Sequence, residues 1–227
     1  MTPIWNRLAY ERGELLSDEH CPGVLAQRRA RRYSGTVGPL NRWVDELRRH
    51  TGERVPHLDP AAARDGAHVL VLLQDPSAAA ATGSGFVSRH NNDPTARNAY
   101  LAAERAGLSY DVSLFWNVVP WWVADPARRA PGRTLTTEAV RARPHLAHLL
   151  GLLDPAPRTI VVAGRHAARA WAHLVRDGHP APGATVLHCP HPSPQAFPMV
   201  DRDSGRRNEE LIVEAFRTAA ASTRVSR

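Results

Sequence analysis

Four short apolar runs that alternate with helical patterns are the feature that most constrains this fold. They cover residues 69–73, 110–116, 159–163 and 184–188, and each stops abruptly at a polar or turn-forming residue. Such runs favour buried strands. Strands that alternate with helices predict a mainly parallel sheet with helices on both faces and right-handed crossovers. We therefore predict an α/β fold, a three-layer α-β-α sandwich around a central, mainly parallel four-stranded sheet.

The helices are predicted from capping signals and apolar spacing. Asp93 followed by Pro94 is a typical start, and Gly107 ends that helix after about residue 106. Further helices are expected at about 39–50, 136–153, 167–176 and 206–221. In the helix expected at 136–153, the predicted inward-facing residues are Val140, Leu146, Leu149 and Leu150. In the helix expected at 206–221, they are Leu211, Ile212, Ala215 and Phe216.

The organisation along the chain predicts one structural domain with two parts. Residues 1–38 show no clear period and are expected to be irregular, and residues 56–67 have the composition of a linker. We therefore expect residues 1–60 to form an N-terminal extension with one helix packed on the core. Residues 61–227 are expected to form the α/β domain.

The charge of the chain favours DNA as a partner. It has 29 Lys plus Arg against 22 Asp plus Glu, a net charge of +7 and a pI of about 10.5. Arginine dominates the cations, and its planar fork suits phosphate. The alternative is that an arginine- and alanine-rich composition reflects a GC-rich genome.

Other classes of protein are disfavoured by the same composition. No apolar run approaches the 18 residues of a membrane span, and the first residues lack the apolar segment of a signal peptide. We therefore expect a cytoplasmic protein without membrane contact. Two cysteines, Cys21 and Cys189, are too few for a disulfide framework or an iron–sulfur cluster, and the histidines show no metal-ligand spacing. We predict no metal and no cofactor.

Polar residues follow the predicted strands, and in a parallel sheet these strand ends meet at one edge, where ligands bind. Asp75 follows the first strand and Asn117 the second, the turn at residues 164–166 follows the third, and His191 follows the fourth. Each has an ordinary alternative, because Asp75 and Asn117 are also typical turn residues. Phe86, in the loop after the first strand, could equally belong to the core.

Taken together, these residues resemble the uracil-DNA glycosylase superfamily. Residues 74–77, Gln-Asp-Pro-Ser, resemble the water-activating loop Gly-Gln-Asp-Pro-Tyr-His, and residues 191–194 match its His-Pro-Ser-Pro loop. Trp116-Asn117 resembles the strand end that reads the pyrimidine, and Gly164-Arg165 resembles a Gly-Ser phosphate loop with Arg in place of Ser. The matches keep the family's order and spacing over residues 69–197.

The resemblance implies a role for each of these residues. Asp75 would activate water or stabilise the sugar cation, and His191 would donate to O2 of the departing base. Asn117 would read the base, Phe86 would stack on it, and Gln74 and Ser77 would lie beside it. The residues implied in DNA binding are Ser88, Gly164, Arg165, His166 and Ser193 at phosphates, with Gln195 or Phe197 filling the gap in the base stack.

Departures from the family pattern bear on specificity. The family's tyrosine, which excludes 5-substituted pyrimidines, is Ser77 here, and small residues continue to Ala81. We therefore predict a monomeric, monofunctional DNA glycosylase that flips uracil or a 5-modified pyrimidine out of DNA and leaves an abasic site. The alternatives are a glycosylase for hypermodified phage bases in antiviral defence, an inactive damaged-DNA-binding protein, and a hydrolase of free nucleosides, against which the arginine content argues.

Overall fold

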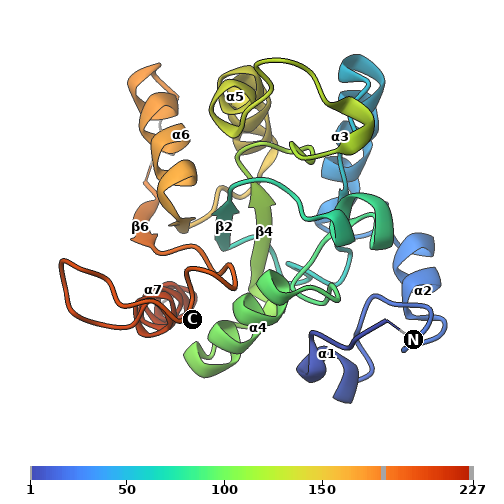
Figure 1. Ribbon diagram of the computed structural model, residues 1–227, viewed down its shortest axis with the longest axis horizontal. Helices are drawn as coiled ribbons and strands as arrows, with labels where there is room; N and C mark the ends of the chain where they lie inside the picture. The colour runs from blue at the N-terminus through green and yellow to red at the C-terminus, as the bar shows by residue number, and fades with distance from the viewer. Residues whose placement is uncertain (1, 180–182, 225–227) are drawn as a thin grey trace.

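A four-stranded parallel sheet forms the centre of the molecule in a computed structural model, which describes residues 2–179 and 183–224 (Figure 1). The strand order is β4-β2-β5-β6, and every neighbouring pair is parallel. The strands are β2 (Val69–Leu73), β4 (Ser113–Asn117), β5 (Thr159–Ala163) and β6 (Thr185–Cys189). The predicted α/β fold with its central four-stranded sheet is confirmed.

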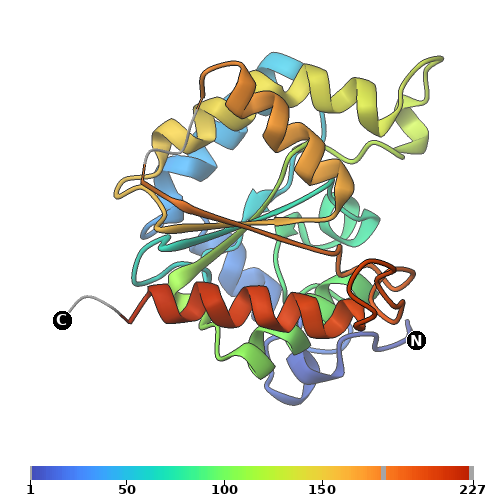
Figure 2. The same cartoon turned by 90° about the vertical axis from the view of Figure 1, so that its left-hand side faces the viewer.

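Helices cover both faces of this sheet and complete the three layers (Figure 2). One layer contains α3 (Val37–Thr51), α5 (Leu135–Leu152) and α6 (Arg165–Arg176), and the other contains α4 (Pro94–Ala106) and α7 (Asn208–Ser222). The N-terminal helices α1 (Arg7–Glu11) and α2 (Val24–Ala30) lie beside the α4 layer. None of the helices in the described ranges is both long and apolar enough to cross a membrane.

Shorter elements connect the layers. A small parallel ladder pairs β1 (His57–Leu58) with β3 (Phe86–Val87), and a π-helical turn (Ala79–Ser84) precedes β3. Two 3₁₀ turns lie at Tyr110–Val112 and Pro126–Arg128. The ladder joins the segment just before the sheet to the loop that follows β2.

The N-terminal segment is more ordered than its composition predicts. Residues 1–38 were expected to be irregular, yet they contain α1 and α2, and the expected linker contains β1. Helices of five and seven residues are too short to display an apolar period. They are stabilised by packing instead, since Ala9 of α1 packs with Tyr100 of α4 and Leu25 of α2 packs with Leu16 and Phe86. In addition, α1 is capped by Asn6, which accepts a hydrogen bond from the Ala9 amide.

The predicted inward face of α5 was wrong at one position. Val140 is 58% exposed, and the buried face is made by Glu138, Ala142, Leu146 and Leu149. Glu138 turns inward because its carboxylate accepts a hydrogen bond from the Trp121 indole at 2.7 Å. Val140 lies six residues before Leu146, about 120° away around the helix, and therefore points away from this face. Two other residues predicted to face inward, Leu150 of α5 and Leu211 of α7, are half-buried.

The N-terminal extension supports a loop that belongs to the α/β part of the chain. The Asn6 amide donates hydrogen bonds to the carbonyl oxygens of Arg89 (2.8 Å) and Asn91 (3.1 Å). The Leu16 backbone N–H donates to the carbonyl of His90 at 3.0 Å. The loop at residues 88–92 is therefore fixed by partners more than 70 residues earlier in the chain.

Candidate active site

A cavity of about 430 Å³ opens where the strands end. Its walls come from the loop after β2, the segment that follows β3, the first turns of α4, the end of β4 and the loop after β6. The sequence-predicted residues that line it are Gln74, Asp75, Ser77, Ser88, Asn117, His191, Ser193 and Gln195. Parallel strand ends have brought together residues up to 121 positions apart, from 74 to 195, as the sheet topology predicts.

A second hollow adjoins this cavity. Gly164, Arg165 and His166, at the start of α6, line it together with His191 and Gln195, which belong to both. Arg165 is exposed and forms no ion pair within residues 2–179 and 183–224. The turn after β5 therefore presents a free guanidinium beside the cavity.

Two predicted aromatic residues are not at the cavity. Phe86 is only 2% exposed, and its ring packs against Leu16 and Leu25 of the N-terminal extension. Its neighbour Val87 lines the cavity instead, because successive side chains of a strand point in opposite directions. Phe197 is 7% exposed and packs in the main core.

Other aromatic side chains reach the cavity in their place. Phe115 of β4 lies two residues before Asn117 on the same face of the sheet, and Trp122 follows the loop after β4. Trp122 is not among the site residues predicted from the sequence. Its position next to Val123, which contacts Asp75, places it at the cavity wall.

Asp75 is a half-buried carboxylate with few polar partners. One of its oxygens accepts a hydrogen bond from the Val123 backbone N–H at 3.1 Å, and the Gln74 side chain donates a second bond. Burial disfavours the charged form and raises the pKa of Asp75 to about 6, against the smaller opposing effect of these two bonds. Such a carboxylate is ionised at neutral pH and still basic enough to accept a proton.

His191 has a defined tautomer. Its Nδ1 accepts a hydrogen bond from the Ser193 backbone N–H at 3.1 Å, so in the neutral ring the proton is on Nε2. Burial, with a smaller contribution from His166, lowers the pKa of His191 to about 4. The side chain is therefore a neutral hydrogen-bond donor at physiological pH.

Asn117 and Ser77 differ in how far their polar atoms are engaged. Asn117 is 2% exposed, and its side-chain amide has no hydrogen-bond partner in the part of the chain that the structure describes. The Ser77 hydroxyl donates to Asp93 at 3.0 Å and accepts from the Ala80 amide at 3.2 Å. Asn117 therefore keeps both a donor and an acceptor for a ligand, whereas Ser77 contributes mainly open space.

Ser88 is engaged on the side away from the cavity. Its hydroxyl donates to the buried carboxylate of Asp59 at 2.6 Å and accepts from the His90 amide at 2.9 Å. Both bonds anchor the 88–92 loop. Ser88 thus contributes to the cavity wall, with its hydroxyl hydrogen already committed.

The position of His191 depends on Gly164, and substitution of this glycine should expose that dependence. Gly164 has φ of +88°, and a Cβ there would lie 2.7 Å from Cβ of His191. We expect Gly164→Ala to displace the His191 imidazole and, for the base excision that the sequence resemblance implies, to lower the rate by at least tenfold, towards the roughly 10²–10³-fold loss of a whole donor. The measurement is the single-turnover rate on a uracil-containing duplex.

The matched control is Gly178→Ala at the other end of α6. Gly178 also has a positive φ, +84°, but no atom lies within 4 Å of the added Cβ, so alanine there adds backbone strain without a collision. An equal loss of activity in both variants would show that strain, and not His191, accounts for the effect.

Asn98 is a contributor that sequence reasoning missed. It lies on the buried face of α4, and its amide donates to the Pro192 carbonyl at 2.9 Å, which ties the His-Pro-Ser-Pro loop to the helix. The only sequence signal is an asparagine within a buried alanine stripe. Met199 and Val200, which follow this loop, are also more than half exposed. Met199 lines the second hollow, and Val200 is the next residue in the chain.

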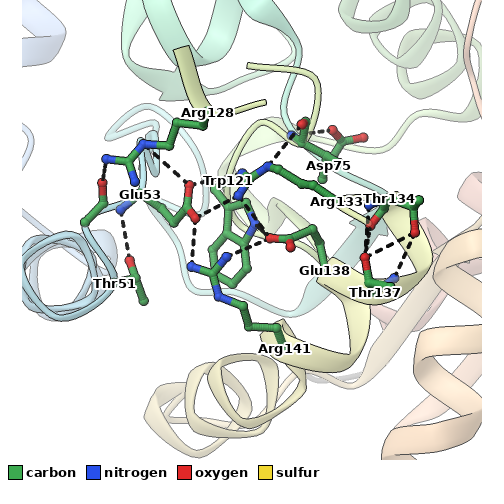
Figure 3. Close-up of polar contacts among 12 residues, drawn as sticks. Thr51, Glu53, Asp75, Trp121, Arg128, Arg133, Thr134, Thr137, Glu138 and Arg141 are labelled. Carbon is green, nitrogen blue, oxygen red and sulfur yellow. Dashed lines mark hydrogen bonds and ion pairs between the residues drawn. The ribbon is translucent and has the colours of Figure 1, made fainter. Parts of the chain in front are cut away.

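A charged cluster lies behind the Asp75 loop (Figure 3). Arg133 forms two hydrogen bonds with the Glu53 carboxylate, at 3.0 and 3.1 Å. Arg141 bridges Glu53 and Glu138, and Glu138 also accepts from Trp121. Arg133 and Arg141 are therefore paired with carboxylates of the protein itself.

The fold and the cavity define an α/β protein with a cavity at the carboxyl edge of its parallel sheet. A family model described as the uracil DNA glycosylase superfamily matches residues 60–217, more than half of the chain. The chain belongs to this superfamily, which as a class consists of DNA glycosylases. No curated protein matches it significantly. Within the described residues, no group of three or more histidine, cysteine or acidic side chains is arranged to hold a metal ion.

Proposed function

We propose that this protein is a monofunctional glycosylase that flips uracil or a 5-modified pyrimidine out of DNA and hydrolyses its N-glycosidic bond. The observation that carries the proposal is the meeting of Asp75, Asn117 and His191 in one cavity at the sheet edge. A half-buried carboxylate, an unengaged amide and a neutral donor are the groups that this reaction needs. An abasic site and the free base are the products.

The chemistry follows from these three groups. As the bond between C1′ and the base nitrogen breaks, its electron pair leaves with the base, and positive charge develops on the sugar. Ionised Asp75 stabilises that charge and takes the proton of the water that adds to C1′. Nε2–H of His191 donates to O2 of the departing base, where negative charge collects. The Asn117 amide pairs with the pyrimidine edge.

The remaining contacts require one change from the sequence prediction. Because Phe86 is buried elsewhere, the flipped base is proposed to pack against Val87, Phe115 and Trp122. Arg165 and His166 would contact phosphates beside the cavity, with Gly164 and Ser193 shaping the backbone there. Gln195 is exposed, so it remains the candidate to fill the gap in the base stack, whereas the burial of Phe197 argues against that residue.

The small side chain of Ser77 supports the proposal that the pocket admits a 5-substituted pyrimidine. A larger side chain at this position should exclude such bases. We expect Ser77→Tyr to retain excision of uracil and to lower excision of 5-substituted pyrimidines by at least about tenfold, because steric differences of this kind discriminate by 10- to 200-fold. The measurement is the appearance of alkali-labile sites in duplexes that carry uracil, thymine mispairs, hypoxanthine and 5-substituted cytosines. Ala78→Tyr, at an exposed neighbour, is the control.

The outcomes of this assay separate the alternatives. Excision confined to the 5-substituted cytosines would favour antiviral defence over repair. Tight DNA binding without excision of any base would identify an inactive DNA-binding protein and contradict the proposal. Release of base from free nucleosides at a rate equal to that from DNA would identify a nucleoside hydrolase. We further propose that the protein is cytoplasmic and monomeric. Sedimentation of the protein with and without DNA would test the monomeric state.

A further inference from the structure

Arg133 connects the buried charged cluster to the candidate catalytic carboxylate (Figure 3). The Arg133 side chain donates a hydrogen bond from Nε to the Val123 carbonyl at 3.3 Å. The backbone N–H of Val123 in turn donates to Asp75 at 3.1 Å. Val123 is therefore held at its carbonyl by Arg133 and offers its amide to Asp75. A shift of this one residue would break the only backbone hydrogen bond that the carboxylate receives among the described residues.

Glu53 keeps Arg133 in this position. The side chain of Glu53 is 4% exposed and that of Arg133 is 10% exposed, and two parallel hydrogen bonds join them. Bidentate pairing of this kind fixes the plane of the guanidinium as well as its distance. Glu53 lies outside residues 60–217, so the family match does not account for this contact.

The other members of the cluster close it on the far side. Arg141 donates to Glu53 at 2.7 Å and to Glu138 at 2.8 Å, and its guanidinium lies 4.5 Å from the centre of the Trp121 ring. Glu138 is 3.4 Å from Arg133. Each buried charge in the cluster thus has an opposite partner, which makes it a firm support for the loop from Trp121 to Val123.

We propose that Arg133, held by Glu53, is a positioning residue that fixes the Val123 amide and thereby orients the Asp75 carboxylate for water activation. Arg133 does not line the active-site cavity, so its effect passes through Val123. The inference rests on the proposed function of Asp75. It adds a contribution from the N-terminal extension to the chemistry of the site.

The acidity of Asp75 provides a readout that a merely structural role would not change. The Val123 and Gln74 bonds favour the charged form of Asp75 and oppose the effect of burial, so loss of the Val123 bond should raise the pKa of Asp75 above about 6. The other titratable or charged groups that line the same cavity are Arg89, Asp93 and His191. None of the substitutions used below alters them.

The test is the pH dependence of excision in Arg133→Lys, compared with the unchanged protein. Lysine keeps a positive charge opposite Glu53 but replaces the planar fork with a single ammonium. In the unchanged protein, activity should rise with pH through about 6 as Asp75 ionises. In Arg133→Lys we expect this rise to move up by roughly half a unit to one unit. The rate at pH 6 should then fall about two- to fivefold and recover at pH 8, with unchanged DNA affinity.

Two further variants make the result decisive. Glu53→Gln should shift the profile in the same direction, because it removes the charge that holds Arg133. Arg128→Ala is the control, since Arg128 bonds to the Gly52 carbonyl and approaches Glu53 but does not contact Val123. A shifted profile in the first two variants and an unshifted one in the control supports the positioning role. An unshifted profile in Arg133→Lys and Glu53→Gln overturns it, whatever their stability.

Failure of the proposed function would be recognised separately. If the unchanged protein excises no base, the pKa of Asp75 can still be measured from its carboxyl ¹³C resonance, with Asp75→Asn used to assign it. A higher pKa in Arg133→Lys than in the unchanged protein supports the positioning of Asp75, and an equal pKa overturns it. The structural inference and the enzymatic one therefore stand on different measurements.

Discussion

Asp75→Asn is expected to lower base excision by about 10²–10⁴-fold, the range typical for loss of a positioned general base. Asparagine has nearly the same shape and can still accept the Val123 bond, but it neither takes a proton from water nor stabilises a sugar cation. Single-turnover excision from a duplex that carries the preferred base is the measurement. DNA affinity should change little.

The control for this variant is Asp93→Asn, which alters a second carboxylate of the same cavity. Asp93 caps α4 by accepting from the Ala96 amide at 2.9 Å, and asparagine caps helices equally well. Its rate should stay close to that of the unchanged protein. If Asp75→Asn excised base at the full rate, Asp75 would have no part in the chemistry.

His191→Ala is expected to lower excision by about 10²–10³-fold, the usual cost of removing one donor to a developing negative charge. DNA affinity, measured by fluorescence anisotropy, should change much less than the rate, because the bond strengthens only as the base departs. His50→Ala, at an exposed residue in the last turn of α3, serves as the control. Equal rates in His191→Ala and the unchanged protein would contradict the assignment.

The pH profile also distinguishes a neutral His191 from a charged one. A histidine with a pKa of about 4 is already neutral above pH 5, so activity should reach a plateau above the ionisation of Asp75 and stay there to pH 8. An imidazolium acid would instead lose its proton, and the rate would fall, as the pH rises through about 6.5. A declining limb between pH 6 and 8 would therefore exclude the neutral donor.

The sheet and the ends of its strands could be predicted from sequence because both follow from local patterns. Short apolar runs define β2, β4, β5 and β6, and parallel topology then requires their carboxyl ends to share an edge. The capping signals at Asp93 and Gly107 likewise set the bounds of α4 as predicted. Residues that directly follow a strand, such as Asp75 and His191, are brought together by this topology alone.

Side chains whose direction depends on distant partners could not be predicted. Phe86 and Val87 are neighbours, and which of them faces the cavity is set by the pairing of β3 with β1, almost 30 residues earlier. The contact between Glu53 and Arg133 spans 80 residues and carries no local signal. An arginine-rich loop looks the same in sequence whether its charges face solvent, DNA or buried carboxylates.

The hydrogen bonds from Asn6 and Leu16 to the 88–92 loop have a consequence for how this family can diversify. The family match begins at residue 60, but part of the pocket wall depends on partners that precede residue 60. The segment needed to build this pocket is therefore expected to be longer than the segment that family members share. Replacing the N-terminal extension with a foreign one would then reshape the wall at Ser88, Arg89 and Asn91 while Asp75 and His191 stay untouched. Substrate range could thus evolve through a region that contributes no catalytic group.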